Sequence, residues 1–425
     1  MLDLQARLRR TPGLYHHYWS SIDRLAQADR SDIEAYWAKQ LGRMMRKPRA
    51  LPAAYHGYGS FEQLPYLSKT DVRSKPESYV RRSFGPTSKK QTSGTTGAAL
   101  TLHRSLASVV FEQAAIDWVV ARAGHDFATE HIAVFRAADI TPSTEPTRLF
   151  WHFEEGGRVM VFRPNCLNRL TLPDFLTALR KFRPDILYAY PSAADQLARL
   201  LEQENNTFRF PLVVTSSEVL SPAMRQRITN TLGAIVVDYY GQGERVCFAY
   251  SVANREYRFM PAYGYVEFLR KSDAAEAEII GTPFHNSAQI LLRYRTGDLV
   301  AIPDVDDDQL RDVSLGKRTF DGITGRSNEV LFGPAGEVLI GLNHIPRGFN
   351  SLGPFQFVQA ARDHVRILVL DPTGGSGETR NRILADARKK IPMSMAIDVE
   401  FTEELLQTPA GKVPFVVHLF QAENQ

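Results

Sequence analysis

A short glycine-rich stretch, Thr92-Ser93-Gly94-Thr95-Thr96-Gly97, offers the most specific chemistry in this chain of 425 residues. Glycines let a backbone turn sharply and expose successive N–H groups, which can form a cradle for phosphate oxygens. The serine and threonine hydroxyls add neutral donors. The stretch is not a Walker A loop, because Ala98 stands where that motif needs a lysine. We therefore predict a phosphate-binding loop of another kind, with a flexible turn as the alternative.

Four further stretches follow in order: Tyr240-Gly241-Gln242-Gly243-Glu244, Tyr294-Arg295-Thr296-Gly297-Asp298, Gly325-Arg326 and Gly411-Lys412. Together with the glycine-rich stretch they resemble the core motifs of the adenylate-forming superfamily, which includes acyl-CoA ligases, luciferases and peptide-synthetase adenylation domains. Two more segments, 66–73 and 184–192, resemble segments typical of phenylacetate-CoA ligases. The chain length also fits that branch and its relatives, the coenzyme F390 synthetases and the CapK-type proteins.

The resemblance implies roles for residues of these motifs. Glu244 is expected to hold Mg²⁺ against the phosphates of ATP, since Mg²⁺ prefers hard oxygen ligands. Asp298 is expected to accept hydrogen bonds from both ribose hydroxyls. Tyr240 is expected to stack on adenine, and if it alternates with Tyr239 on a strand, only one of the two faces the ligand. Lys412 is expected to neutralise negative charge as a carboxylate attacks the α-phosphorus.

The resemblance also implies the remaining contacts to the nucleotide. Ser216-Ser217-Glu218 follows the apolar run Leu212–Thr215 and is expected to line adenine at a strand's carboxyl end. Glu218 could instead cap a helix beginning near residue 221. Arg326 is expected to contact ribose or phosphate, with a domain hinge two residues later. The predicted ATP site comprises Thr92, Ser93, Gly94, Thr95, Thr96, Gly97, Ser217, Glu218, Tyr240, Gly241, Asp298 and Arg326, with Glu244 as metal ligand and Lys412 and Glu244 as catalytic residues.

Two positions depart from the family pattern. Gly243 precedes Glu244 where relatives usually carry Thr, Arg or Ser, so one donor to the α-phosphate is missing and the loop gains freedom. Ala98 is the other departure. Both keep open an alternative from a different class, a scaffold or sensor that binds adenylate without catalysis. The retention of the four charged motif residues argues against that alternative.

The pattern of apolar runs predicts an α/β fold for the greater part of the chain. Short apolar runs alternate with amphipathic stretches between residues 134 and 300, which predicts a mainly parallel sheet covered by helices. The expected order is strand Ile186–Tyr190, helix Ala193–Gln203, strand Leu212–Thr215, helix Pro222–Leu232 and strand Ile235–Tyr239. Antiparallel strands are expected at 264–269 and 289–294. The first 80 residues are expected to be helical, with one helix beginning near Asp32.

A different pattern begins near Gly325. Strands are expected at 337–340, 355–361, 366–370 and 397–401, with a helix at 378–390, which together describe a compact α+β unit. We therefore expect two domains. Residues 1–325 would form a large domain that binds ATP and the acid, and residues 326–425 a small mobile domain joined to it by a hinge.

Composition narrows the class of protein. The formal charge is +4, and no dense Lys/Arg tract suggests a nucleic-acid partner. No run of apolar residues reaches the length of a membrane span. Two cysteines cannot build a disulfide framework, so a cytoplasmic location is expected. Cys166, Cys247 and His103 show no metal-site or nucleophile spacing. A homodimer is compatible with these features.

The expected function is that of an AMP-forming acid–thiol ligase. A carboxylic acid would attack ATP to give an acyl-adenylate and pyrophosphate, and the acyl group would pass to coenzyme A, as the resemblance implies. The sequence contains no motif for coenzyme A that we recognise. The acceptor could instead be a carrier-protein thiol, or a hydroxyl or amine of a glycan, as the CapK resemblance permits. A further alternative is transfer of AMP itself to a phenolic hydroxyl, as in F390 synthetases.

Overall fold

The computed structural model describes most of the chain. The residues outside the description are 1–7, 46–50, 82–86, 92–99, 137–149, 221, 271–275, 303–304, 324–330, 340–341, 343–344, 347–348, 350–351, 353–354, 372–373, 407–413 and 421–425. The predicted domain boundary at residue 325 falls within one of these gaps.

Helices dominate the N-terminal part of the description, as predicted. The α-helices are α2 (Pro12–Gln27), α3 (Arg30–Met45) and α4 (Lys69–Ser74), and the 3₁₀ turns are η2 (Ala53–Tyr55) and η3 (Pro76–Tyr79). Helix α3 begins two residues before the predicted start at Asp32. Ser68 caps α4, because its hydroxyl accepts from the Asp71 N–H while the Asp71 carboxylate accepts from the Ser68 N–H.

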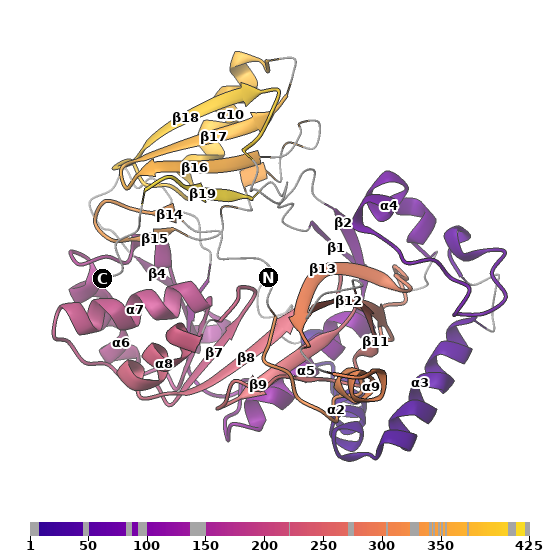
Figure 1. The fold of residues 1–425 in the computed structure, drawn as a ribbon. Coiled ribbons are helices and arrows are strands. Elements are labelled where there is room, and N and C mark those ends of the chain that lie inside the picture. The colour runs from indigo at the N-terminus through magenta and orange to yellow at the C-terminus, as the bar shows by residue number, and fades with distance from the viewer. Residues whose placement is uncertain are drawn as a thin grey trace.

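The largest sheet has eight strands in the order β10-β9-β8-β7-β6-β3-β5-β4 (Figure 1). Strands β5, β3, β6, β7 and β8 run parallel, whereas β4, β9 and β10 are antiparallel to their neighbours. Their bounds are β3 (Ile132–Phe135), β4 (Trp151–Glu154), β5 (Val159–Phe162), β6 (Ile186–Ala189), β7 (Leu212–Ser216), β8 (Ile235–Gly241), β9 (Phe248–Val252) and β10 (Arg258–Phe259). All five residues of β7 are buried, as expected for a central strand covered on both faces.

Helices connect these strands in the predicted alternation. They are α5 (Leu106–Ala121), α6 (Leu172–Phe182), α7 (Pro191–Gln203) and α8 (Pro222–Leu232), and two further 3₁₀ turns are η4 (Glu155–Gly157) and η5 (Pro164–Cys166). Helices α6, α7 and α8 share one buried apolar cluster with residues of β3, β6, β7 and β8, so they cover one face of the sheet. The predicted α/β fold with a mainly parallel sheet is confirmed.

A second, antiparallel sheet has the order β11-β12-β13, with β11 (Gly264–Arg270), β12 (Glu276–Pro283) and β13 (Tyr294–Ala301), followed by α9 (Asp307–Ser314). The first predicted strand here is confirmed. The strand predicted at 289–294 is wrong, because β13 only begins at Tyr294. The segment before it forms only an isolated antiparallel bridge between Gln289 and Val80, with the Ile290 N–H donating to the Tyr79 carbonyl at 3.0 Å. The Tyr55 hydroxyl donates to the Ile290 carbonyl and accepts from the Leu292 N–H, so a side chain satisfies backbone groups that a strand would have paired.

A two-stranded hairpin flanks the glycine-rich stretch. Strand β1 (Thr87–Gln91) pairs antiparallel with β2 (Thr101–Ser105), and Gln91 lies opposite Thr101. The side chain of Asn286 holds β2 in place, since its Oδ1 accepts from the Ser105 N–H at 3.1 Å and its Nδ2 donates to the His103 carbonyl at 2.9 Å. Residues 92–97 themselves lie outside the described residues.

The C-terminal region contains a separate four-stranded sheet, drawn at the top of Figure 1. Its order is β18-β17-β16-β19, with β16 (Phe355–Ala361), β17 (His364–Leu370), β18 (Ala396–Thr402) and β19 (Val416–His418), and α10 (Gly377–Arg388) packs on it. It has its own buried apolar cluster. A short hairpin of β14 (Leu331–Phe332) and β15 (Val338–Leu339) precedes it and contacts α7, where the Gln196 amide donates to the Gly336 carbonyl. The predicted small α+β unit is confirmed in its fold, a sheet with a helix packed on it.

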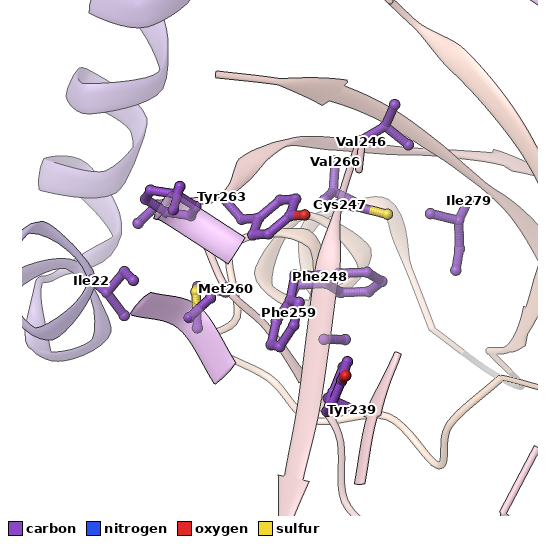
Figure 2. Packing of buried hydrophobic residues seen from close by; sticks show 14 of the residues in the cluster. Ile22, Tyr239, Val246, Cys247, Phe248, Phe259, Met260, Tyr263, Val266 and Ile279 are labelled. Atoms are coloured by element: carbon purple, nitrogen blue, oxygen red, sulfur yellow. The ribbon is translucent and has the colours of Figure 1, made fainter. Parts of the chain in front are cut away.

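The core beneath β8 and β9 is rich in aromatic residues (Figure 2). Phe248 stacks on Tyr239 with ring centroids 5.2 Å apart and on Tyr263 at 5.4 Å. Cys247 is completely buried beside them. In the part of the chain that the structure describes, no group of three or more His, Cys, Asp or Glu could hold a metal, and none of the helices has the length and apolar character of a membrane span.

His285 is a packed imidazole whose protonation state affects folding. Its ring stacks on Phe111 with centroids 3.6 Å apart, and its Nε2 lies 2.7 Å from the Ala262 carbonyl. Because a carbonyl can only accept, Nε2 carries the proton. Burial lowers the pKa of His285 from its ordinary 6.5 to about 4. The folded protein therefore keeps this side chain neutral.

We expect His285→Gln to weaken the pH dependence of the unfolding free energy. The stability linked to the neutral imidazole is present above pH 6.5 and is lost as the pH falls toward about 4. The wild-type protein should lose about 2 kcal/mol from this source between pH 8 and pH 5. Burial raises the pKa of Asp238 to about 6, so this carboxyl adds stability as the pH falls. Its contribution is the same in the wild-type protein and in His285→Gln, and it cancels when their pH dependences are compared. Urea unfolding at the two pH values measures the difference, and equal losses in both proteins would contradict the assignment.

Candidate functional site

The carboxyl ends of four parallel strands form one edge of the large sheet. Strands β3, β6, β7 and β8 end there, and the chain continues into Arg136, Tyr190, Ser217 and Gln242. Ligands of open α/β sheets bind outside this edge. Ser216 ends β7, and Ser217 and Glu218 follow it, so this stretch lies at a strand's carboxyl end, as predicted.

Tyr239 and Tyr240 point in different directions from β8. Tyr239 is buried, stacks on Phe248, and its hydroxyl lies 2.5 Å from that of Tyr188. Tyr240 is only partly buried, and its hydroxyl donates to Asp298 Oδ2 at 2.8 Å. Burial, and then the charge of Asp298, raise the pKa of Tyr240 well above 10, so the phenol keeps its proton. Of the two rings, Tyr240 is the one that a ligand can reach.

Strand β13 carries two residues of the site on one face. Tyr294, Thr296 and Asp298 are buried while Arg295 and Gly297 are exposed, which is the period of two expected of a strand. Asp298 contacts Tyr240, and the Tyr294 hydroxyl donates to Glu244 Oε1 at 2.9 Å. A single strand thus brings the predicted ribose ligand and the predicted metal ligand together.

Glu244 lies in a tight turn after β8. The Arg245 N–H donates to the Gln242 carbonyl at 3.1 Å, so Gly243 and Glu244 are the central residues of the turn. Neither central residue is among the described residues with positive φ, whereas Arg245 has φ +56°. The turn is therefore of type I, and its conformation does not require glycine at position 243.

Arg104 of β2 supports this turn from a distant part of the sequence. One guanidinium nitrogen donates to the Gly243 carbonyl at 2.7 Å, while the Nε of Arg104 is buried with no hydrogen-bond partner among the described residues. Burial, and then the charge of Arg245, lower the pKa of Arg104 to about 10. Arg245 lies 3.6 Å from the carboxylate of Glu112. Two guanidinium groups and the Glu112 carboxylate therefore lie beside the Glu244 turn.

We expect Gly243→Thr to raise the rate of adenylate formation by about fivefold, the value of one restored neutral hydrogen bond to phosphate. Threonine fits the backbone because Gly243 lacks a positive φ. Gly243→Val is the matched control, since valine has the same shape without the hydroxyl. Single-turnover rates measure the effect. If threonine gives no gain over valine, another group already supplies the donor, and Arg104 is the first to test.

The structure describes fewer contacts for the other predicted site residues, and some of them lie outside the described residues. Ser217 is exposed and has φ +73°, an uncommon conformation for a residue other than glycine. Glu218 is partly buried, and α8 begins at Pro222. Because residue 221 lies outside the described residues, the alternative that Glu218 caps this helix stays a prediction. Gly241 ends β8 opposite Phe248. Thr92, Ser93, Gly94, Thr95, Thr96, Gly97, Arg326 and Lys412 all lie outside the described residues.

Three residues of the site were not assigned roles from the sequence. Tyr294 belongs to the YRTGD stretch, and alternation along a strand would have placed it on the same face as Asp298. Arg136 lies outside all of the motif stretches. Arg104 is separated from Gly243 by 139 positions, and no local pattern could have indicated that contact.

The part of the chain that holds these residues is similar to a known protein family. Residues 91–302 match the family model described as AMP-binding enzyme. The chain carries an AMP-binding enzyme domain. This domain includes β3, β6, β7, β8 and β13, and therefore Tyr240, Glu244 and Asp298. Over residues 91–302, the predicted resemblance is confirmed as an AMP-binding enzyme domain.

Individual proteins similar to the chain have low sequence identity. Protein CapK of Staphylococcus aureus is 22% identical over 367 residues, which cover 84% of this chain and 80% of that protein. A crystal structure of 2-hydroxyisobutyryl-CoA ligase in complex with 2-HIB-AMP and CoA aligns with a TM-score of 0.49 and 15% identity, covering 97% and 92% of the two chains. The amide bond synthetase McbA from Marinactinospora thermotolerans aligns with a TM-score of 0.39 and 17% identity, covering 76% and 67%.

Proposed function

We propose that this protein activates a carboxylic acid with Mg-ATP, giving an acyl-adenylate and pyrophosphate, and then transfers the acyl group to coenzyme A. One observation carries the proposal. Within the AMP-binding enzyme domain, Tyr240 with Asp298 and Tyr294 with Glu244 form two hydrogen-bonded pairs beside the carboxyl edge of the sheet. One pair suits a nucleoside and the other suits metal-bound phosphates.

The nucleoside would bind at the first pair. The Asp298 carboxylate is held by the Tyr240 hydroxyl, and an ionised carboxylate can accept hydrogen bonds from both ribose hydroxyls. The Tyr240 ring would then support adenine, since its hydroxyl is fixed and its side chain remains partly exposed. Ser217 and Glu218 would line the base from the end of β7.

The residues present fit Mg²⁺ bound together with ATP. Glu244 supplies one carboxylate, and the described residues contain no larger cluster of metal ligands. Mg²⁺ is commonly held by one or two carboxylates with the remaining positions filled by substrate phosphates and water. When bound, the ion would neutralise phosphate charge, and the Tyr294 hydroxyl would orient Glu244 toward it.

The chain's other groups would stabilise the transition state. The glycine-rich stretch Thr92–Gly97 would donate N–H groups to phosphate oxygens. Lys412 would place a positive charge at the α-phosphate as the carboxylate attacks, and Arg326 would contact ribose or phosphate. Rotation of a small domain, residues 326–425, about a hinge near Asn328 would then withdraw Lys412 and admit the acceptor thiol.

Pyrophosphate release with a panel of carboxylic acids tests the first step. We expect ATP-dependent release that requires both Mg²⁺ and an acid, together with exchange of labelled pyrophosphate into ATP. Coenzyme A, an amino sugar and a phenol are then offered separately as acceptors. Acyl-CoA formation supports the second step, and products with the other acceptors would replace it. Absence of both release and exchange with every acid would overturn the proposal.

A further inference from the structure

Arg136 occupies an unusual position at the carboxyl edge of the sheet. It directly follows β3, where the Tyr190 N–H donates to the Phe135 carbonyl at 3.1 Å. Its guanidinium carbon lies 4.4 Å from the ring centre of Tyr188 and 4.8 Å from that of Tyr190. One guanidinium nitrogen donates to Ser217 Oγ at 2.9 Å. The side chain therefore crosses from β3 past β6 to the end of β7.

The partners of Arg136 leave its charge unbalanced. Within the described part of the chain, they are the rings of Tyr188 and Tyr190, the phenol of Tyr239 and the hydroxyl of Ser217, and no carboxylate lies within ion-pair distance. Aromatic rings favour a cation at such a distance but do not neutralise it. A guanidinium has five N–H donors and keeps its charge at every pH of interest. A partly buried cation with neutral partners is stabilised when an anion binds.

The Arg136 guanidinium lies close to the place where the acid would react with ATP. The ends of β3 and β8 are three strand spacings apart, about 14 Å. Because Arg136 reaches Ser217, the residue that follows β7, its donors lie within about one strand spacing of β8, which leads into the Glu244 turn. An acid activated beside Glu244 could therefore extend a short tail to Arg136. Ser217 holds its hydroxyl toward Arg136 from a backbone with φ +73°.

We propose that Arg136 binds a second carboxylate on the substrate, so that the protein activates dicarboxylic acids. The inference rests on the proposed adenylation and adds its substrate class. Rings pack against the faces of a guanidinium and leave the N–H groups along its edge, a geometry that matches a planar carboxylate with two hydrogen bonds. One carboxylate of the substrate reacts with ATP, and the other stays ionised at Arg136 and fixes the orientation of the acid.

Two matched pairs of acids test the proposal: succinate against butyrate, and terephthalate against 4-methylbenzoate. Each pair exchanges a carboxylate for a methyl group of similar size. We expect kcat/KM for pyrophosphate release to favour the dicarboxylate by about 10- to 100-fold in at least one pair. Arg136→Gln should reduce that preference to nearly one by lowering the dicarboxylate value, and Arg136→Lys should keep part of it.

Arg122→Gln is the control variant. Arg122 also lies over an aromatic ring, with its guanidinium carbon 5.3 Å from the Trp118 centroid, but it follows α5 before β3 begins. This variant should leave the preference unchanged. The melting temperature and the ATP affinity of each variant show whether Arg136 acts only on structure. 4-Sulfobenzoate, which carries a tetrahedral anion, should be a poorer substrate than terephthalate.

The outcomes separate the inference from the function on which it rests. Release with the methyl acids and no preference for the dicarboxylates overturns the inference and supports adenylation. Equal losses for both members of a pair in Arg136→Gln also overturn it, because Arg136 would then contact the reacting carboxylate or the nucleotide. Equal use of 4-sulfobenzoate and terephthalate overturns carboxylate recognition. Absence of release with any acid in a broad panel overturns adenylation itself.

Discussion

Lys412→Ala is expected to lower the rate of acyl-adenylate formation by about 10²–10³ and to leave the melting temperature unchanged. The physical reason is that attack on the α-phosphate concentrates negative charge, and a preorganised ammonium stabilises that charge most where water is excluded. Lys412 follows Gly411 in the last of the five motif stretches, which the resemblance places at the reacting phosphate. The binding of ATP should change far less than the rate.

The measurement is single-turnover formation of acyl-adenylate by quenched flow. Lys389→Ala is the matched control, because Lys389 also belongs to the C-terminal region and pairs on the surface with Asp386 at 2.6 Å. Its removal should cost little, since exposed ion pairs contribute less than about 1 kcal/mol. A Lys412→Ala protein that forms adenylate at the wild-type rate would remove Lys412 from the chemistry and leave the rest of the site intact.

Local patterns predicted the regular elements well. Helix α8 (Pro222–Leu232) and strand β16 (Phe355–Ala361) have the predicted bounds, because a proline at a helix start and a run of apolar residues are local signals. The short strands β14, β19 and β10 were not predicted. Two or three residues hold too little pattern, and each strand exists only through its partner, as β19 does beside β16.

The errors at the site have a different origin. The apolar residues 290–292 predict a strand, but the Tyr55 hydroxyl, 235 positions away from Ile290, takes the Ile290 carbonyl and the Leu292 N–H that a strand would have paired. Motif resemblance named Tyr240, Glu244 and Asp298, yet the hydroxyl of Tyr294 and the guanidinium groups of Arg104 and Arg136 became visible only in three dimensions. Such contacts join residues distant in sequence, and their chemistry depends on burial and on which charges lie nearby. A single sequence contains no direct record of either.

The Asp298 carboxylate is the group whose neutralisation should most weaken nucleotide binding. It is 7% exposed on β13, and the Tyr240 hydroxyl donates to its Oδ2 at 2.8 Å. Asp298→Asn keeps the shape of the side chain but removes the charge and one acceptor. Tyr240→Phe removes only the hydroxyl and leaves the carboxylate ionised. The two variants therefore separate the charge of Asp298 from its orientation.

We expect Asp298→Asn to raise the Kd of ATP by roughly 10²-fold, because two hydrogen bonds to an ionised acceptor are weakened. Tyr240→Phe should raise it by only about fivefold, the value of one neutral donor. Calorimetry with ATP and with 2′-deoxy-ATP identifies the bound group. The wild-type protein should prefer ATP, and Asp298→Asn should lose most of that preference if the carboxylate holds the ribose. The Kd of the acid, measured without nucleotide, should stay the same in both variants. Unchanged ATP binding in Asp298→Asn, or an undiminished preference over the deoxynucleotide, would assign Asp298 to the fold alone.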